Sequence, residues 1–170
     1  MKILPVEPRH IPALSALAAK TFTDTFGHLY PPGDLQTFLR ASYAHDVLAA
    51  EVAGPDQFWR MAWLGDEAAA YLQACPVGLP HPDADPAREG ELKRLYVDTS
   101  HHGRGIGKQL LALGLGYLSE RYGDAPQWIG VWSENIKAQA LYRANGFEKA
   151  GEYGFVVGGV TDREFILRKR

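Results

Sequence analysis

The sequence predicts a mixed α/β domain, and three observations lead to that prediction. Apolar residues recur at helical spacing between residues 11 and 26. Two apolar runs, residues 58–64 and 68–74, flank the turn Gly65-Asp66-Glu67, a pattern typical of a β-hairpin. A third apolar run, residues 92–97, leads through a glycine-rich turn into a segment that again follows a helical period. The chain therefore contains both helices and strands in alternation.

Turn residues and periodicity predict the remaining elements. Residues 2–6 form a short strand, and the Pro31-Pro32-Gly33 cluster separates the first helix from a second one. We expect Asp34 to cap this second helix, which has a possible extension through residues 47–48. Residues 76–90 carry four prolines and form a loop. Then follow a strand at 128–131, a helix at 135–144 and a terminal hairpin that turns near Gly158-Gly159, which gives the order β-α-α-β-β-β-α-β-α-β-β.

Length and composition restrict the class of protein. A chain of 170 residues corresponds to one domain, residues 1–170, that buries roughly 70% of its unfolded surface. The net charge of −2 gives no basic surface for nucleic acid or an anionic membrane. No apolar run approaches the roughly 20 residues of a membrane span, and the N-terminus is too polar for a signal peptide. We therefore expect a cytoplasmic protein with neither nucleic acid nor membrane as a partner.

The glycine-rich turn predicts an anion site. Gly103, Gly105 and Gly107 follow an apolar strand and open a helix. The free N–H groups at a helix N-terminus point outward, and the helix dipole adds about half a positive charge there. The turn therefore predicts a bound phosphate.

Two common nucleotide-binding motifs do not fit this turn. A P-loop has Ser or Thr after its Gly-Lys pair, whereas Gln109 follows Gly107-Lys108 here. A dinucleotide-binding fingerprint has an acidic residue about 20 residues on, at the end of a second strand, but that distance falls in a loop before Trp128. The predicted phosphate therefore belongs to another kind of ligand.

Two motifs together resemble the GNAT superfamily of acyl-CoA N-acyltransferases. The first is H-G-R-G-I-G at residues 102–107, which matches [QR]-x-x-G-x-[GA] except that His102 stands where Gln or Arg is usual. The second is N-I-K-A-Q-A-L-Y-R-A-N-G-F at residues 135–147, which matches N-x-x-A-x-x-L-Y-x-x-x-G-F. The resemblance covers nearly the whole chain. Residues 21–39, 130–138 and 155–167 are similar to the bacterial spermine/spermidine acetyltransferase-like group.

This resemblance implies a fold and a cosubstrate. The implied GNAT fold has a central mixed, mostly antiparallel sheet of about six to seven strands with about four helices, and its splayed fourth and fifth strands form the acyl-CoA cleft. Acetyl-CoA is the implied cosubstrate, and a homodimer is compatible with the family. No metal is implied, and the six histidines show no metal-binding spacing.

The resemblance also implies which residues bind acetyl-CoA. The open edge of the central strand pairs with pantetheine, the backbone of the glycine turn holds the pyrophosphate, and an asparagine both caps its helix and bonds the pantetheine arm. The implied residues are Leu95, Tyr96, Val97, His102, Gly103, Arg104, Gly105, Ile106, Gly107, Lys108 and Asn135.

Tyr142 and Glu91 are the implied catalytic residues. A tyrosine at the position of Tyr142 protonates the leaving thiolate in the family, and a phenol of pKa about 10 is protonated at neutral pH. Glu91 is the candidate general base, acting through ordered water, and strand alternation is expected to set it on the same face as Lys93 and Leu95. The alternatives are a core aromatic for Tyr142 and an exposed strand-end acid for Glu91.

The remaining chemistry-bearing residues are weaker candidates. Cys75 is expected to be a buried, inert thiol, and the pair His101-His102 is expected in a surface turn. Five polar residues could face the acceptor: Thr21, Asp24, Tyr30, Glu134 and Asp162. We therefore expect acetyl transfer to a primary amine of a small molecule, with a polyamine as one candidate. The alternatives are a protein or peptide N-acetyltransferase and a non-catalytic CoA-binding sensor.

Overall fold

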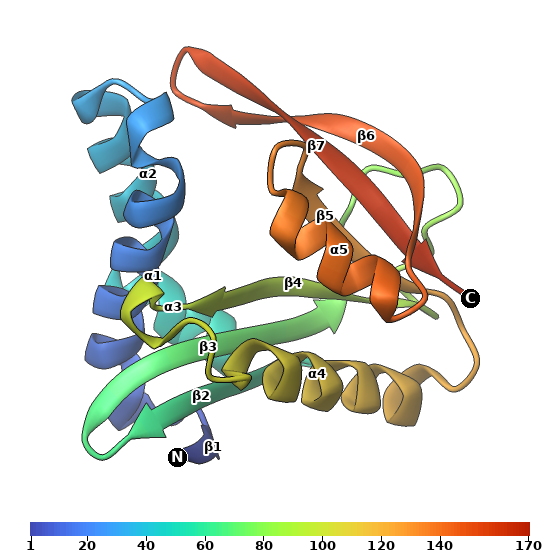
Figure 1. Cartoon of the computed structure of the whole chain (residues 1–170), viewed down its shortest axis with the longest axis horizontal. Helices are drawn as coiled ribbons and strands as arrows, with labels where there is room; N and C mark the ends of the chain where they lie inside the picture. Colours follow the sequence, from blue (N-terminus) through green and yellow to red (C-terminus); the bar gives the residue numbers. More distant parts are fainter.

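The computed structural model describes all of residues 1–170 and contains one seven-stranded sheet (Figure 1). The strand order is β1-β2-β3-β4-β5-β7-β6. Only the β4–β5 pair is parallel, and the others are antiparallel. The predicted mixed, mostly antiparallel sheet is therefore confirmed. The strands are β1 (Lys2–Pro5), β2 (Phe58–Leu64), β3 (Glu67–Pro76), β4 (Gly90–Val97), β5 (Gln127–Trp132), β6 (Glu148–Val157) and β7 (Val160–Lys169).

Five α-helices cover the sheet, because the expected second helix is two helices separated at Ala44, whose backbone is extended. Asp34 does not cap the second helix as predicted. That helix starts at Pro32, whose fixed φ suits a first helical position, and the Asp34 carboxylate accepts a hydrogen bond from the Gly159 backbone N–H at 3.2 Å. The helices are α1 (Ile11–Phe26), α2 (Pro32–Tyr43), α3 (His45–Ala53), α4 (Ile106–Tyr122) and α5 (Ile136–Ala144).

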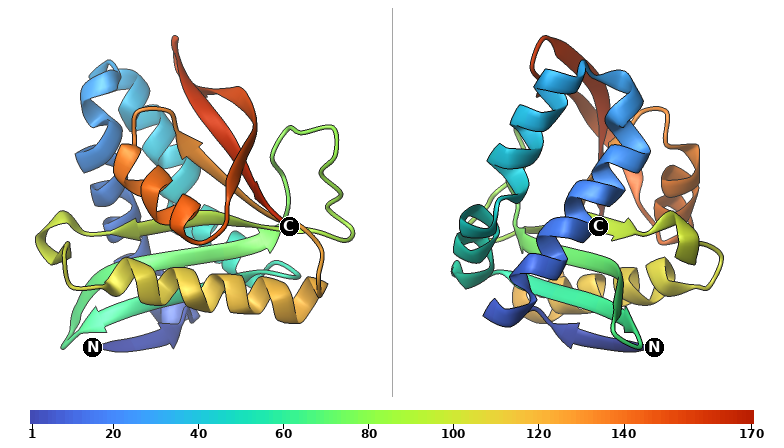
Figure 2. Two further views of the ribbon diagram at one scale, coloured as in Figure 1. Left: turned by 45° about the vertical axis from the view of Figure 1, so that its right-hand side comes forward. Right: turned by 90° about the vertical axis from the view of Figure 1, so that its left-hand side faces the viewer.

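Helices lie on both faces of the sheet (Figure 2), and each face carries its own hydrophobic core. Successive strand residues point to opposite faces, so Leu72 packs in the core under α4, whereas Tyr71 packs in the core under α1–α3. Tyr142 of α5 belongs to the α4-side core. No helix combines the length and apolar character that a membrane crossing requires.

Strands β4 and β5 separate soon after they meet. Their parallel pairing extends only over Gly90–Leu92 and Gln127–Ile129. Beyond that point β5 continues along β7 up to Trp132, while β4 continues along β3 up to Val97 (Figure 1). The second half of β4 therefore has no strand on its β5 side, as the predicted splay requires.

A bulge in β4 changes the predicted direction of Glu91. Gln73 of β3 is opposite Arg94, but the next residue of β3 is opposite Leu92, so Lys93 is the extra residue. Leu92, Leu95 and Val97 all pack on the α4 side, although strict alternation would separate Leu92 from the other two. The prediction that Glu91 shares a face with Leu95 is therefore wrong.

The C-terminal hairpin turns at Gly158-Gly159 as predicted, and its tip lies against α2 (Figure 1). The ring of Phe155 on β6 packs edge-on against that of Phe38 on α2, with centroids 5.7 Å apart. The Tyr30 hydroxyl donates a hydrogen bond to the Asp162 carboxylate of β7. These contacts close one side of the space between the sheet and the helix pair α1 and α2.

Candidate active site

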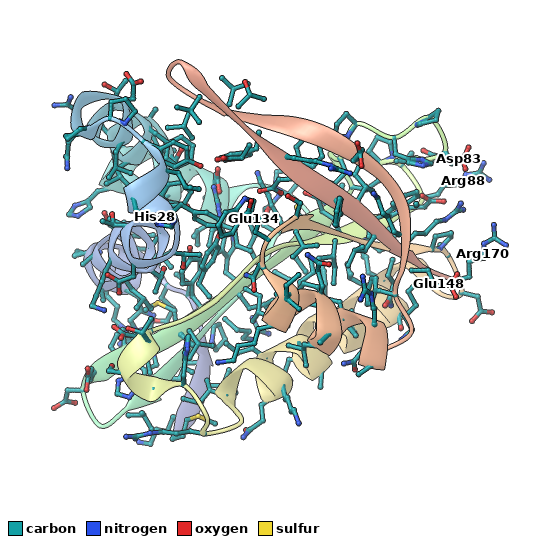
Figure 3. All side chains as sticks on the ribbon, turned by 45° about the horizontal axis from the view of Figure 1, so that its top comes forward. His28, Asp83, Arg88, Glu134, Glu148 and Arg170 are labelled. Carbon is teal, nitrogen blue, oxygen red and sulfur yellow. The ribbon has the colours of Figure 1, made fainter.

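A cavity of about 700 Å³ occupies the opening between β4 and β5. Its walls come from β4 and β5, from α1, α2 and α5, from the loop after β3, and from the hairpin β6–β7. His102 of the first motif, Asn135, Ala138 and Tyr142 of the second, the N-terminal helices and the C-terminal hairpin therefore meet around one space. In Figure 3, Glu134 lies between the helix pair and the C-terminal hairpin, whereas Asp83, Arg88, Glu148 and Arg170 gather at the opposite end of the molecule.

The open half of β4 forms one wall of this cavity. Leu95, Tyr96 and Val97, the residues predicted to pair with pantetheine, all line it. His102 lines it as well, and its ring Nε2 lies 2.9 Å from the Val97 carbonyl oxygen. The His102 side chain therefore also fixes the end of β4.

The glycine turn has the backbone geometry of an anion site. Gly103 and Gly105 have φ values of +79° and +76°, in the left-handed region that favours glycine. A Cβ at either position would have no atom within 4 Å, so the space beside both is open. Gly105 is the N-cap of α4, and the backbone N–H groups of the first helical turn follow it.

The side chains around this turn differ in their accessibility. Arg104 and Lys108 are exposed, so both cations can approach a bound phosphate. Ile106 is buried in the core, so only its backbone is available. On the far side of the opening, the Asn135 side chain accepts a hydrogen bond from the Ala138 N–H at 3.1 Å, caps α5 and lines the cavity. The turn, the open strand edge and this cap fit an elongated ligand with phosphates at one end and amides at the other.

Glu91 is a buried carboxylate of the cavity wall, with 5% of its surface exposed. Its Oε2 accepts a hydrogen bond from the Gly78 backbone N–H at 3.1 Å. Burial raises the pKa of this carboxyl above its ordinary 4.5, because it disfavours the charged form, and the Gly78 hydrogen bond offsets part of that shift. The alternative of an exposed strand-end acid is therefore wrong.

Tyr142 lines the same cavity from α5 and is also part of the core, with 6% of its surface exposed. Burial, together with the negative charge of Glu164, raises the pKa of its phenol to about 12. The hydroxyl therefore stays protonated at neutral pH. Tyr142 and Glu91 come from opposite sides of the opening, since one follows β5 and the other begins β4.

Sequence reasoning did not identify Tyr153 and Glu164, which also line the cavity. The Tyr153 hydroxyl donates to Glu164 Oε2 at 3.0 Å, and burial raises the pKa of the Glu164 carboxyl. Gly130 makes room for this pair, because a Cβ there would lie 3.2 Å from the Tyr153 oxygen. Glu164 could have been found only by predicting that β5 pairs with β7, since Trp132 is opposite Glu164 in that pair.

Of the five predicted acceptor-side residues, only Tyr30 lines the cavity. The Asp162 carboxylate accepts the Tyr30 hydrogen bond. Thr21 is buried and donates to the Leu17 carbonyl at 2.8 Å, and Asp24 accepts from Lys20 at 2.8 Å. These three and Glu134 therefore do not form the acidic wall that a polyamine site would need.

Cys75 and His101 lie in buried positions. Cys75 lines the cavity, and burial raises the pKa of its thiol to about 12, so the nucleophilic thiolate is scarce at neutral pH. His101 is 7% exposed, so the prediction of a surface turn is wrong for this residue. The structure shows no group of three or more His, Cys, Asp or Glu side chains that could hold a metal ion.

Comparison with known proteins identifies the family. The model of the acetyltransferase (GNAT) family matches residues 17–147, so the chain belongs to this family. It is 31% identical over 172 residues to an uncharacterised N-acetyltransferase of Lactobacillus delbrueckii subsp. lactis, covering 99% of this chain and 96% of that protein. The protein is accordingly an N-acetyltransferase of the GNAT family, and its predicted class as an acyltransferase is confirmed.

Two further relatives are informative. The spermine/spermidine N(1)-acetyltransferase of Bacillus subtilis is 33% identical over 64 residues, which cover 38% of this chain and 42% of that protein. The structure of the PaiA N-acetyltransferase of Thermoplasma acidophilum in complex with coenzyme A superposes with a TM-score of 0.78 at 18% identity, over 99% of this chain and 98% of that one. The latter likeness confirms the predicted GNAT fold.

Proposed function

We propose that the protein transfers an acetyl group from acetyl-CoA to a primary amine of a small molecule, by direct transfer in a ternary complex. One observation supports this most: the open edge of β4, the buried carboxylate of Glu91 and the protonated phenol of Tyr142 all face one cavity. The glycine turn that begins α4 lies directly after that edge. Binding, proton acceptance and proton donation can therefore occur in one enclosed space.

Binding of acetyl-CoA is assigned to backbone groups. The N–H groups of residues 103–108 would hold the pyrophosphate, with Arg104 and Lys108 adding positive charge, and residues 95–97 would pair with the pantetheine amides. Bound acetyl-CoA supplies the activated acetyl thioester. A backbone N–H of the open half of β4 would donate to the thioester oxygen, on which negative charge develops.

Glu91 is assigned the role of proton acceptor. An amine reaches the site mostly as an ammonium ion and must lose a proton before its nitrogen can attack. A buried carboxylate of raised pKa is a better base for this step than an exposed one, because it holds the proton more tightly. Glu91 would take the proton directly or through one water molecule and then release it to solvent.

Tyr142 is assigned the role of proton donor to the departing sulfur. The N–C bond forms as the C–S bond breaks, and the ammonium ion loses two protons in all. One leaves through Glu91, and the other accounts for the thiol hydrogen of the released CoA, passed on by way of the Tyr142 hydroxyl. Cys75 takes no part, because its buried thiol has a pKa of about 12.

Release of CoA thiol from acetyl-CoA, measured with a panel of primary amines, tests this function. We expect thiol release that depends on an amine, intersecting initial-velocity lines when both substrates are varied, and an active Cys75→Ala variant. Parallel lines together with an inactive Cys75→Ala variant would indicate an acyl-enzyme and contradict direct transfer. Turnover with a peptide only would indicate a protein N-acetyltransferase, and acetyl-CoA binding without turnover would indicate a sensor.

A further inference from the structure

One part of the cavity has an aromatic lining. On the face of the sheet opposite α4, it is lined by rings from α1, α2, β5 and β6, namely Phe22, Phe26, Phe38, Trp132 and Phe155. We propose that the acceptor is a monoamine with an aryl group on a short alkyl chain, whose ring lies against these side chains. This inference rests on the proposed function and specifies its substrate class.

These aromatic residues form one connected surface. Phe22 meets Phe26 with ring centroids 4.9 Å apart and Phe38 at 4.5 Å, Phe26 meets Trp132 at 5.5 Å, and Phe38 meets Phe155 at 5.7 Å. The contacts join the helix pair to the sheet and to the C-terminal hairpin. An aromatic ring placed here could make offset or edge-on contacts with several neighbours at once.

Core packing alone does not account for all of these rings. Phe22 and Phe26 are 2% and 8% exposed, as expected for residues of the α1-side core. Phe38, Trp132 and Phe155 pack against that core but are only half-buried, and all three line the cavity. Their remaining accessible surface is available to an apolar group of a ligand.

The charges around the cavity favour one ammonium group over several. Two carboxylates line it: Glu91, which is buried, and Glu164, which is half-buried. Lys93 and Arg94 line it too, and the positive charge of Lys93 acts on Glu91. Arg94 is paired with the Glu51 carboxylate, so Glu51 is not free for a second cation. A polyamine would bring several ammonium groups to a cavity lined by two carboxylates and two cations.

The reacting amine and the ring have separate places in this arrangement. Glu91 lies on β4, across the strand opening from Glu164 on β7, whose cross-strand neighbour is Trp132. The rings of Phe22, Phe26 and Phe38 lie farther along the aromatic surface, on α1 and α2. A short alkyl chain would connect an amine near the carboxylates with a ring on that surface. A bare alkylamine would leave the aromatic surface without a ligand group.

The test compares phenethylamine, n-butylamine and spermidine as acceptors in the thiol-release assay. We expect kcat/KM for phenethylamine to exceed that for either of the others by about tenfold, a factor that corresponds to about 1.4 kcal/mol. Equal values, or a preference for spermidine, would overturn the aryl-amine inference and leave the acetyl-transfer function intact. No thiol release with any amine would overturn the proposed function and the inference with it.

A pair of neighbouring variants locates the effect. Phe155→Ala removes a ring of the aromatic surface, whereas Val156→Ala changes the next residue, which is 62% exposed and lies outside the cavity. We expect Phe155→Ala to raise KM for phenethylamine about three- to tenfold and to change that for n-butylamine less than twofold, with Val156→Ala like the wild type. Equal effects of Phe155→Ala on both amines would contradict a ring-binding role, and circular dichroism of both variants checks folding.

Discussion

Replacing Glu91 with glutamine tests the assigned proton acceptor with little change in shape. The glutamine side chain keeps one oxygen that can accept the hydrogen bond from the Gly78 N–H, which is 3.1 Å long in the wild type. It cannot take a proton from an amine. General-base catalysis is worth about 10²–10⁴ in rate, so we expect Glu91→Gln to lower kcat by at least about 100-fold. Acetyl-CoA binding should be unchanged, because Glu91 precedes the open half of β4.

The pH profile gives an independent measure of the same group. The base must be deprotonated to act, so kcat/KM of the wild type should rise with pH through the Glu91 pKa, which burial raises above 4.5. A second rise, near the pKa of the amine itself, belongs to the substrate. Glu91→Gln should lose the first rise and retain the second.

Stability should change in the opposite direction from activity. A carboxyl whose pKa is raised in the folded state favours folding below its unfolded pKa, and this contribution is lost as the pH rises through the folded value. At pH 7, which lies above the ordinary value of 4.5, the raised pKa of the buried Glu91 carboxyl therefore lowers the stability of the fold. We expect the melting temperature of Glu91→Gln at pH 7 to equal or exceed that of the wild type.

Glu89→Gln is the matched control for this experiment. Glu89 is also buried, but it accepts a hydrogen bond from Trp128 Nε1 at 2.6 Å and does not line the cavity. A glutamine oxygen can accept the same bond. Stopped assays of thiol release for both variants over pH 5–10, with acetyl-CoA saturating, test whether Glu91 is the proton acceptor. The reasoning is refuted if Glu91→Gln retains more than a third of wild-type kcat with an unchanged pH profile, or if Glu89→Gln loses as much.

Three further predictions concern the donor, the phosphate cradle and the core. Tyr142→Phe should lower kcat about tenfold or more without weakening acetyl-CoA binding. Because the pKa of the Tyr142 phenol is about 12, its ionisation should cause no loss of wild-type activity in the same assay up to about pH 10. Gly105→Glu places a carboxylate and a side chain at φ +76°, so acetyl-CoA affinity measured by calorimetry should fall at least about tenfold, whereas Gly116→Glu, at an open position of α4, should leave it unchanged. Gly114→Ala brings a Cβ to 2.5 Å from Leu92 Cδ1 and should destabilise the fold in urea titrations by about 1–2 kcal/mol, whereas Gly116→Ala should stabilise it by up to about 1 kcal/mol.

Most of the fold could be predicted from local patterns. The bounds of α1 and the turn of the C-terminal hairpin agree with the structure, because apolar periodicity and paired glycines act within a few residues. The separation of α2 from α3 was not predicted, since Ala44, whose backbone is extended, is a good helix former. Local propensity is a weak guide where tertiary packing decides.

The site was less predictable than the fold. The motifs led to the cavity residues of β4 and α5 and to His102, because these residues lie within or next to recognisable sequence motifs. The bulge at Lys93 left no such signal, and it reversed the expected face of Glu91. Glu164 reaches the cavity through the pairing of β5 with β7, which joins residues more than 30 positions apart, and Tyr153 is opposite Glu164 in the pairing of β6 with β7.

The bulge and the strand opening together explain how one strand can serve two sides of the sheet. Without Lys93 as an extra residue, Glu91 would lie on the same face as Leu95 and point toward α4, away from the aromatic acceptor surface. With Lys93 as an extra residue, the first turn of α4 lies on one face of β4 and the Glu91 side chain lies on the other. The gap between β4 and β5 connects the two faces. A thioester entering from the glycine turn and an amine entering from the helix pair would then meet at the gap. Deleting Lys93 should therefore abolish acetyl transfer more completely than any change to the Lys93 side chain, and Lys93→Ala is the variant that distinguishes the backbone effect from the charge.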